Sequence, residues 1–277
     1  MTEIQIILLS LLQGITEFLP VSSSGHLILF SKFTAFPDQG QAMDVALHIG
    51  SIFAVIIYFA PTLWEIIQGL WKTKFLPNFK NEGSQLFYLL VIATVPVIVC
   101  GAGLKYYGTE WLRNTKLIGW NILCYGLLLW AADWLSVTIR KIRNLEFKDA
   151  LLIGMAQCLA LLPGTSRSGI TITMCRLLGM ERREAAKFSM LLSIPAILAA
   201  GILAGYQLWQ NGNMQQIADA YSAIGYSFIF SMAAIYILMQ WLKKWSFLPF
   251  VIYRVALGGI LLLDAYGIYD IQTLLLK

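Results

Sequence analysis

Long apolar stretches dominate the chain, and six of them are long enough to form membrane-spanning helices. They occupy residues 42–60, 85–104, 117–136, 187–207, 221–241 and 249–266. A helix rises about 1.5 Å per residue, so roughly 20 apolar residues cross a hydrocarbon core of about 30 Å. The pattern therefore predicts an all-α, polytopic membrane protein with about six transmembrane helices.

Two further apolar regions, residues 4–31 and 150–180, are interrupted at their centres by Pro, Gly and Ser. The first centre is residues 19–25 (LPVSSSG) and the second is residues 163–169 (PGTSRSG). Each arm has only about 15 residues, which is too short to cross comfortably. Irregular backbone at membrane depth is tolerated only where it is buried in protein or lines a cavity. We therefore expect two re-entrant helical hairpins that belong to a functional site.

The two interrupted regions also resemble each other. Residues 13–25 (QGITEFLPVSSSG) align without gaps with residues 157–169 (QCLALLPGTSRSG). An odd number of spans separates the hairpins, so the second half should be inverted, as in many transporters. We predict a single membrane domain with an inverted repeat, of which the halves cover about residues 1–136 and 146–277. The alternative is a chance similarity between two Ser- and Gly-rich loops.

Composition and charge support a membrane protein and exclude several other classes. The chain of 277 residues is 58% hydrophobic and 13% charged, with a mean hydropathy of +0.69, whereas soluble proteins carry about 25% charged residues. The net charge is +5, but the basic residues lie in short patches between apolar runs, so we expect no nucleic-acid partner. Most of the 20 Lys and Arg residues fall in loops on one predicted side, which indicates that this side is cytoplasmic and that both termini lie outside.

Neither cysteine nor histidine forms a metal-binding pattern. The four cysteines lie in or beside apolar runs without a C-x-x-C pair, and the two histidines, His26 and His48, are far apart. Small buried thiols are the better interpretation. Neither a P-loop nor a G-x-S-x-G motif is present, which excludes those two kinds of catalytic site.

Glu17 and Arg167 are the most informative charged residues, because each lies within an interrupted apolar region. Ionisable groups at such depth are costly and are functional candidates by default. Gln13 precedes Glu17 by one helical turn and shares its face. Arg167 needs an anion, which could be Glu17, a phosphate or both in turn, and its planar fork suits phosphate oxygens. The alternatives are a hydrogen-bonded structural acid and a purely structural Glu17–Arg167 ion pair.

Serines surround the predicted hairpin tips. Ser22–Ser24 and the pair Ser166 and Ser168 each precede an apolar helix, and helix N-termini attract anions. A hydroxyl there could also act as a nucleophile, although such serines are often only helix caps. His26 follows directly and could act as a base, as a phosphate donor or simply as a satisfied polar residue.

Three further polar residues lie within apolar segments, and we rank them behind the tips. Asp44 and His48 are one helical turn apart and could pair with each other. Arg254 could snorkel to the membrane interface.

These residues together resemble a known family. Gln13-x-x-x-Glu17 followed by residues 19–26 (LPVSSSGH) is similar to the first motif of bacterial undecaprenyl-diphosphatases, the bacitracin-resistance proteins. Residues 163–171 (PGTSRSGIT) fit their second motif, P-G-x-S-R-S-x-x-T, and residues 246–254 (SFLPFVIYR) are also similar. The resemblance covers essentially the whole chain. That family accepts Glu or Gln at position 13, whereas Ser24 stands where Thr is common.

The resemblance implies an integral inner-membrane phosphatase that opens to the periplasm. Its substrate would be undecaprenyl diphosphate, which it cuts to the monophosphate and inorganic phosphate. This reaction recycles the lipid carrier for peptidoglycan synthesis and confers bacitracin resistance. A divalent cation, Mg²⁺ or Ca²⁺, is also implied. The partners would be the polyprenyl diphosphate and membrane lipid, and the oligomeric state stays open, a homo-oligomer included.

The resemblance also implies the roles of individual residues. Glu17, Ser23, His26 and Arg167 would be catalytic. Diphosphate binding would involve Gln13, Ser22, Ser24, Gly164, Ser166, Ser168 and Thr171. From the residues we favour Ser23 as the nucleophile, with Glu17 as its general base. In the competing scheme Glu17 holds the metal or a directly attacking water, with assistance from His26. A transporter or flippase of polyprenyl phosphate is the alternative function, and a structural scaffold fits less well with embedded charges.

Overall fold

The chain folds into an assembly of α-helices. The computed structural model describes residues 1–34, 36–107, 112, 114–136, 139–211 and 214–269. The helices are α1 Glu3–Thr16, α2 Ser23–Phe33, α3 Gly40–Tyr58, α4 Ala60–Lys72, α5 Glu82–Tyr107, α6 Thr115–Leu135, α7 Phe147–Cys158, α8 Arg167–Leu177, α9 Arg182–Asn211, α10 Met214–Trp241 and α11 Leu248–Ala265. No strand occurs within these ranges, so the predicted all-α class is confirmed.

Five of the described helices are long and apolar enough to cross a membrane. They are α3, α5 over residues 82–104, α6, α10 over residues 215–241, and α11. The remaining predicted span, residues 187–207, lies within the 30-residue helix α9, although the side chains of its last part fall outside the described residues. The structure therefore confirms a polytopic membrane protein.

Both interrupted regions form two short helices joined at the predicted centres. Helices α1 and α2 have 14 and 11 residues, and α7 and α8 have 12 and 11, so each is only about 16–21 Å long. Helix α1 contacts α2, and α7 contacts α8. These lengths are short for a membrane of about 30 Å, as expected for hairpins.

The two hairpin tips share an unusual local conformation. Ser22 and Ser166 both have positive φ angles, 80° and 71°, which non-glycine residues rarely adopt. Each serine caps the next helix, since its side chain accepts a hydrogen bond from the backbone N–H of Gly25 or Gly169, at 3.3 and 3.0 Å. This equivalence agrees with the sequence similarity of the tips. The complete inverted repeat stays a prediction.

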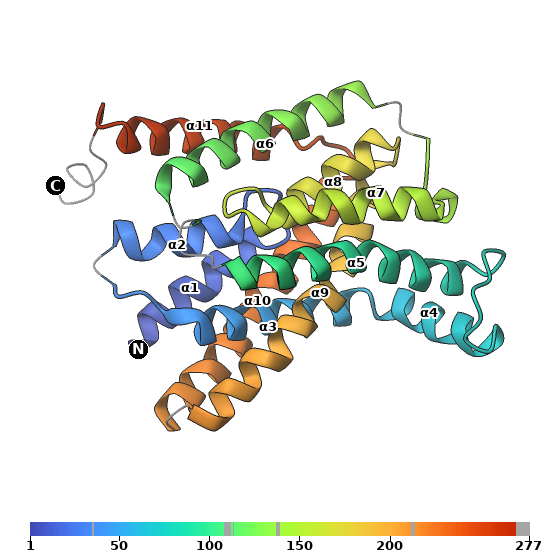
Figure 1. Ribbon diagram of the computed structural model, residues 1–277, viewed down its shortest axis with the longest axis horizontal. Coiled ribbons are helices and arrows are strands. Elements are labelled where there is room, and N and C mark those ends of the chain that lie inside the picture. The colour runs from blue at the N-terminus through green and yellow to red at the C-terminus, as the bar shows by residue number, and fades with distance from the viewer. Residues whose placement is uncertain (35, 108–111, 113, 137–138, 212–213, 270–277) are drawn as a thin grey trace.

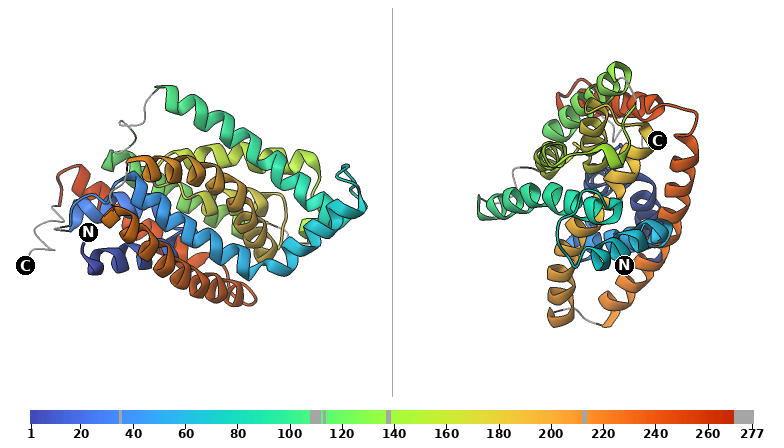
Figure 2. Two further views of the ribbon diagram at one scale, coloured as in Figure 1. Left: turned by 90° about the horizontal axis from the view of Figure 1, so that it is seen from below. Right: turned by 90° about the vertical axis from the view of Figure 1, so that its right-hand side faces the viewer.

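The longer helices enclose the hairpins. Helices α6 and α11 run side by side at one edge of Figure 1, whereas α3, α9 and α10 form the opposite side. Helix α8 packs on α6 and α9, and α1 packs on α10 and α3. In the views of Figure 2, many of the helices run obliquely along the long axis. The two tips lie inside the protein, since Ser22, Ser166 and Ser168 are at most 4% exposed.

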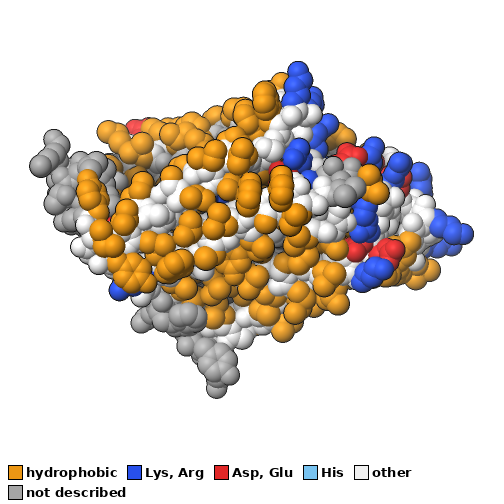
Figure 3. Space-filling view, turned by 90° about the horizontal axis from the view of Figure 1, so that it is seen from above, with side chains coloured by type: hydrophobic (Ala, Val, Ile, Leu, Met, Phe, Trp, Pro, Cys, Tyr) orange, Lys and Arg blue, Asp and Glu red, His pale blue; other side chains and the backbone are white. Residues whose placement is uncertain are grey.

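The surface is apolar along most of the molecule and charged at one end. Figure 3 shows a broad hydrophobic face with Lys and Arg gathered at the end where α4 and the start of α5 lie. The exposed basic residues that connect the helices there include Lys72, Lys74, Lys80, Lys141 and Arg143. This is the end that the charge pattern predicts to be cytoplasmic.

Helix α4 was not expected, because the sequence pattern placed its residues in a loop. Its exposed apolar side chains Trp64, Ile67 and Trp71 recur at helical spacing, and the two tryptophans are 60% and 70% exposed. Tryptophan is enriched at membrane interfaces, and an amphipathic helix with this pattern is typical of an interfacial segment. This periodicity was the signal for the helix, but a stretch of 13 residues is too short to count as a span.

Candidate active site

Glu17 is the centre of the site, and it lies directly after the end of α1. Its side chain is buried, and its Oε2 atom accepts hydrogen bonds from Gln13 Nε2 at 3.2 Å and Ser23 Oγ at 2.5 Å. Its Oε1 atom accepts one from Arg167 Nη2 at 3.1 Å, and His48 Nε2 lies 3.4 Å from Oε2. A buried charge is stable only when it is paired and hydrogen-bonded, and these four side chains satisfy that condition.

Arg167, the first residue of α8, connects the second hairpin to the first. Besides Glu17, its guanidinium donates through Nη1 to the backbone oxygen of Ser189 at 2.8 Å. The predicted meeting of Glu17 and Arg167 is therefore confirmed. A guanidinium carries five N–H donors, and this side chain is 15% exposed, so it can still bind a further anion.

Ser23, the first residue of α2, carries the hydroxyl that is best placed to act as a nucleophile. Its Oγ donates to the carboxylate of Glu17 at 2.5 Å, which is the geometry that a nucleophile and its general base require. The neighbouring Ser24 is exposed, and its Oγ lies 3.5 Å from that of Ser22. Of the serines in the first tip, Ser23 is the one hydrogen-bonded to the central carboxylate.

The predicted residues of the second tip contribute mainly to joining the two tips. Ser168 Oγ lies 3.1 Å from the backbone oxygens of both Glu17 and Leu19. Ser166 Oγ lies 3.2 Å from Ser168 Oγ. Gly164 lies beside Gly25 of the first tip, because a Cβ atom added to Gly25 would lie 3.5 Å from the Cα atom of Gly164. Hydrogen bonds from Ser168 therefore join the second tip directly to the backbone of the first.

Thr171 is fully buried beneath the site rather than facing it. Its Oγ1 donates to the backbone oxygen of Arg167 at 2.8 Å and lies 2.6 Å from Ser189 Oγ. Ser189 thus contacts both Arg167 and Thr171. Sequence reasoning missed this serine, because a single hydroxyl within an apolar run carries little signal.

His26 is not brought to the carboxylate. Its Nδ1 lies 2.6 Å from the backbone oxygen of Ser22 and its Nε2 lies 2.6 Å from the hydroxyl of Tyr253, on which the ring also stacks. A carbonyl can only accept, so Nδ1 carries a proton, and in the neutral imidazole Nε2 then accepts from the Tyr253 hydroxyl. Its catalytic role stays a prediction.

His48 takes the position near Glu17 instead. Its Nδ1 lies 2.6 Å from the backbone oxygen of Asp44, one helical turn away, and this contact directs Nε2 toward Glu17. His48 ranked behind the tips as a candidate, because nothing in the local sequence pattern shows that α3 passes beside α1.

Arg254 does not snorkel, and that expectation was wrong. The side chain is fully buried, and it donates to backbone oxygens that include those of Pro20 and Thr165, both at 3.1 Å. Carbonyl groups in the interior satisfy the guanidinium, so it has no need to reach water.

The comparison with known families agrees with the site. The family model described as bacitracin resistance protein BacA matches residues 6–260. The chain belongs to the BacA family. The resemblance that the two motifs indicated is thereby confirmed.

Several relatives within the BacA family match this chain over almost its whole length, and each is called an undecaprenyl-diphosphatase. The protein of Dinoroseobacter shibae is 46% identical over 270 residues, which cover 96% of this chain and 100% of the relative. Those of a Jannaschia species and of Ruegeria pomeroyi are 45% and 43% identical over 268 residues, with the same coverage.

The cation that the BacA-family resemblance implies can be compared with the donors at the site. No group of three or more His, Cys, Asp or Glu side chains in the described parts of the chain could hold a metal ion. Mg²⁺, however, is often held by one or two carboxylates together with substrate phosphates. Glu17 provides a carboxylate, and Gln13 Oε1 is buried with no hydrogen-bond partner among the described groups. These donors fit a cation shared with a diphosphate.

Two adjoining apolar cavities lie beside the first hairpin of this BacA-family protein. Their volumes are about 420 and 540 Å³, and they share a wall from α1 and the start of α11. The common lining residues are Leu11, Ile15, Leu19, Pro249 and Phe250. The larger cavity also reaches His26 and Tyr253, so an apolar path leads toward the first tip.

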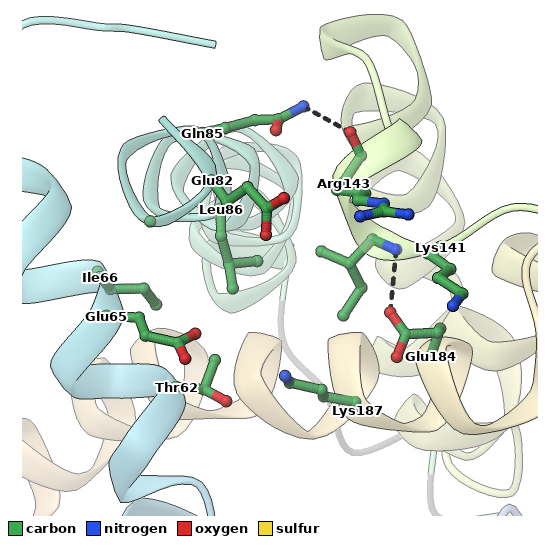
Figure 4. A pocket seen from close by; sticks show the side chains of 12 residues that line it. Thr62, Glu65, Ile66, Glu82, Gln85, Leu86, Lys141, Arg143, Glu184 and Lys187 are labelled. Carbon is green, nitrogen blue, oxygen red and sulfur yellow. Dashed lines mark hydrogen bonds between the residues drawn. The ribbon is translucent and has the colours of Figure 1, made fainter. Parts of the chain in front are cut away.

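A third cavity, of about 230 Å³, lies at the charged end of the molecule, between α4, α5 and α9 (Figure 4). Its charged lining comprises Glu65, Glu82, Glu184, Lys141, Arg143 and Lys187. Ile142 N donates to Glu184 at 3.1 Å, and Gln85 donates to the backbone oxygen of Arg143 at 3.4 Å. The three acidic side chains equal the three basic ones in number, so the formal charges of the lining cancel. The cavity shares no residue with the Glu17 cluster and is therefore separate from the active site.

Proposed function

We propose that this protein hydrolyses undecaprenyl diphosphate to undecaprenyl phosphate and inorganic phosphate. The observation that carries the proposal is the convergence of Ser23 and Arg167 on the single carboxylate of Glu17. The names of the relatives and the membership of the BacA family agree with it. The reaction recycles the lipid carrier for cell-wall synthesis and confers resistance to bacitracin.

Ser23 is the proposed nucleophile. Its Oγ attacks the terminal phosphorus while Glu17, 2.5 Å away, accepts the hydroxyl proton. The bond between that phosphorus and the bridging oxygen breaks, and undecaprenyl phosphate leaves with the electron pair. Water then cleaves the phosphoserine and releases inorganic phosphate. The competing scheme, in which Glu17 orients an attacking water directly, uses the same pair of tips.

Arg167 is the proposed clamp for the diphosphate. Phosphoryl transfer depends mainly on positioning and on the stabilisation of spread negative charge, and a guanidinium binds phosphate oxygens through two parallel hydrogen bonds. The contact with Ser189 holds one side of the fork. Substrate phosphate would share or replace Glu17 on the other side.

A divalent cation, Mg²⁺ or Ca²⁺, is proposed to bind between the protein and the diphosphate. Glu17 and Gln13 Oε1 are the residues that would hold it. When bound, the cation supplies neutralisation of the phosphate charge. Gln13 also donates to Glu17 through Nε2 at 3.2 Å. This hydrogen bond orients the carboxylate without the help of a cation.

The prenyl tail is proposed to lie in the two apolar cavities along α1. They are lined almost entirely by apolar side chains, and the lining of the larger one includes His26 and Tyr253. Burial of apolar surface contributes about 25 cal/mol per Å², so a long tail adds affinity at a distance from the reacting phosphorus. His26 stands where tail and headgroup would meet.

We further propose that the protein lies in the inner membrane with its basic end in the cytoplasm. The exposed Lys and Arg residues gather at the end that holds α4 (Figure 3), and cytoplasmic loops carry an excess of such residues. The Glu17–Arg167 site would then open to the periplasm.

The deciding experiment is phosphate release by the purified protein. Undecaprenyl diphosphate in detergent is supplied with Mg²⁺ or Ca²⁺, and inorganic phosphate is measured over time. The wild-type protein should release phosphate over many turnovers, and Arg167→Ala should not. A flippase would move the lipid across vesicles without releasing phosphate, and that result would overturn the proposal.

A further inference from the structure

Arg254 is unusual because a fully buried guanidinium in α11 is satisfied by backbone oxygens alone. Its three nitrogens carry five N–H groups and make six contacts of 3.0–3.2 Å with acceptors, so one hydrogen is shared between two of them; its side chain has 0% exposure. The acceptors are the carbonyl oxygens of Pro20, Asn121, Ile122, Gly164 and Thr165. All of these acceptors are backbone oxygens, and none is a carboxylate.

These carbonyls belong to three separate elements. Pro20 lies in the first tip, between Glu17 and Ser23, whereas Thr165 lies in the second tip, shortly before Arg167. The other acceptors include residues of α6, beside which α11 packs. One side chain therefore joins the backbones of both hairpin tips and fastens them to the surrounding helices.

The surrounding structure leaves space for this guanidinium. A Cβ atom on Gly126 would lie 2.9 Å from Arg254 Cβ, and one on Gly169 would lie 3.1 Å from Arg254 Nη1. Both distances are shorter than the ordinary van der Waals distance between a Cβ atom and a neighbouring heavy atom. The absence of side chains at these two positions allows α6 and α8 to close around the arginine.

We infer that Arg254 is a positioning residue: it sets the separation between the two tips, and hence between Ser23, Glu17 and the guanidinium of Arg167. The effect on catalysis rests on the proposed phosphatase function. A lysine keeps the charge, but its three donors radiate from one atom, so it cannot bridge acceptors on both tips and α6. Loss of the bridge would let the tips separate without removing any reacting group.

The first test compares turnover in Arg254→Lys with a matched control, Arg176→Lys. Arg176 is also almost fully buried, but it pairs with Asp133 at 2.9 Å near the far end of α8. Because small misplacements of reacting groups can cost about 100-fold in rate, we expect kcat to fall at least about tenfold in Arg254→Lys. KM should change less than about threefold, since tail binding is unaffected. Folded Arg176→Lys should keep kcat within about twofold.

The second test does not depend on activity. Amide hydrogen exchange is measured by mass spectrometry on peptides that cover residues 17–25 and 162–169, in Arg254→Met, Arg254→Lys and the corresponding Arg176 variants. We expect faster exchange at both tips in the Arg254 variants and unchanged exchange there in the Arg176 variants. If Arg254→Met does not fold, the lysine variant carries the comparison.

The two tests separate failure of the inference from failure of the proposed function. Wild-type kcat and wild-type tip protection in Arg254→Lys would overturn the positioning role, whatever the substrate. A kcat loss without faster exchange at the tips would overturn it as well. Faster exchange at both tips in the Arg254 variants, together with no phosphate release by the wild-type protein, would support the positioning role of Arg254 and reject the proposed phosphatase.

Discussion

At the residue scale, the site depends on how the negative charge of one buried carboxylate is neutralised and hydrogen-bonded. Glu17 receives hydrogen bonds from three side chains and lies close to His48. Arg167 faces the opposite requirement, because it is a mostly buried cation with one acidic partner among the described residues. Removing either charge leaves the other without its partner, which commonly destabilises a protein by about 3–5 kcal/mol. Activity and stability should therefore be measured together for every variant of this pair.

Replacement of the central carboxylate should abolish turnover. Glu17→Gln keeps the shape of the side chain but cannot take the proton from Ser23 or neutralise Arg167. We expect phosphate release to fall more than about 100-fold, since a general base contributes about 10²–10⁴-fold, and we expect a lower melting temperature. Activity above a tenth of wild type would contradict the central role of Glu17. Glu3→Gln, a change of the same type at an exposed position at the start of α1, serves as the control.

The two mechanisms differ in their prediction for Ser23→Ala. If Ser23 is the nucleophile, the variant should have less than about 1% of wild-type kcat, because the acceptor oxygen is gone. Retained phosphate release, together with inactivity of Glu17→Gln, would favour direct attack by water. Ser31→Ala is the control, since Ser31 lies on the same helix and donates only locally, to the backbone oxygen of Ile28 at 3.3 Å.

At the element scale, the tips depend on backbone that ordinary residues rarely adopt. Ser22 and Ser166 have left-handed φ angles, and Gly164 has φ = 90°. At Gly164 an added Cβ would also lie 2.6 Å from the backbone oxygen of Ile118. The second tip can therefore approach α6 only with glycine at this position.

Gly164→Ala should consequently disrupt the second tip. The positive φ alone costs about 1–2 kcal/mol for alanine, and the clash with Ile118 adds to it. Two glycines allow these contributions to be separated. Gly40→Ala has a similar φ of 77° in open space, and Gly225→Ala, in α10, has open space without a positive φ. We expect stability to fall most for Gly164→Ala, less for Gly40→Ala and not at all for Gly225→Ala, and turnover to fall only for Gly164→Ala. Equal thermal stability of the first two variants would contradict the close approach.

At the scale of the whole molecule, an apolar surface with one basic end predicts a definite orientation. Two helical hairpins that do not cross leave the chain on the side from which it entered. Under this arrangement the connection between α2 and α3 lies outside, whereas the connection between α4 and α5 lies in the cytoplasm.

Labelling of single cysteines in intact cells checks this topology. In a background without the four native cysteines, Asp38→Cys should react with an impermeant maleimide, and Lys80→Cys should react only after the membrane is permeabilised. Both positions are exposed in the structure, so a lack of reaction reflects the membrane rather than burial. Labelling of both positions from the same side would show that α3 does not cross the membrane. The reverse pattern, with Lys80→Cys labelled in intact cells and Asp38→Cys labelled only after permeabilisation, would contradict the predicted orientation.

Much of this protein follows from its linear order of residues, because hydrophobicity and helix breaks are local properties. Apolar runs locate the membrane helices, the clusters of Pro, Ser and Gly locate the bends near Pro20 and Gly164, and an embedded Glu17 and Arg167 point to a site. The amphipathic helix α4 was missed since a span-length criterion ignores short helices.

Other features depend on where distant helices come to lie beside one another. The partners of Arg254 are more than 85 positions away along the chain, and no local pattern can show that five carbonyl groups converge on it. The same holds for the proximity of His48 to Glu17 and for the pairing of His26 with Tyr253. These contacts arise because charged and polar side chains cannot stay unpaired in an apolar interior, and the packing of the helices determines which partners are within reach.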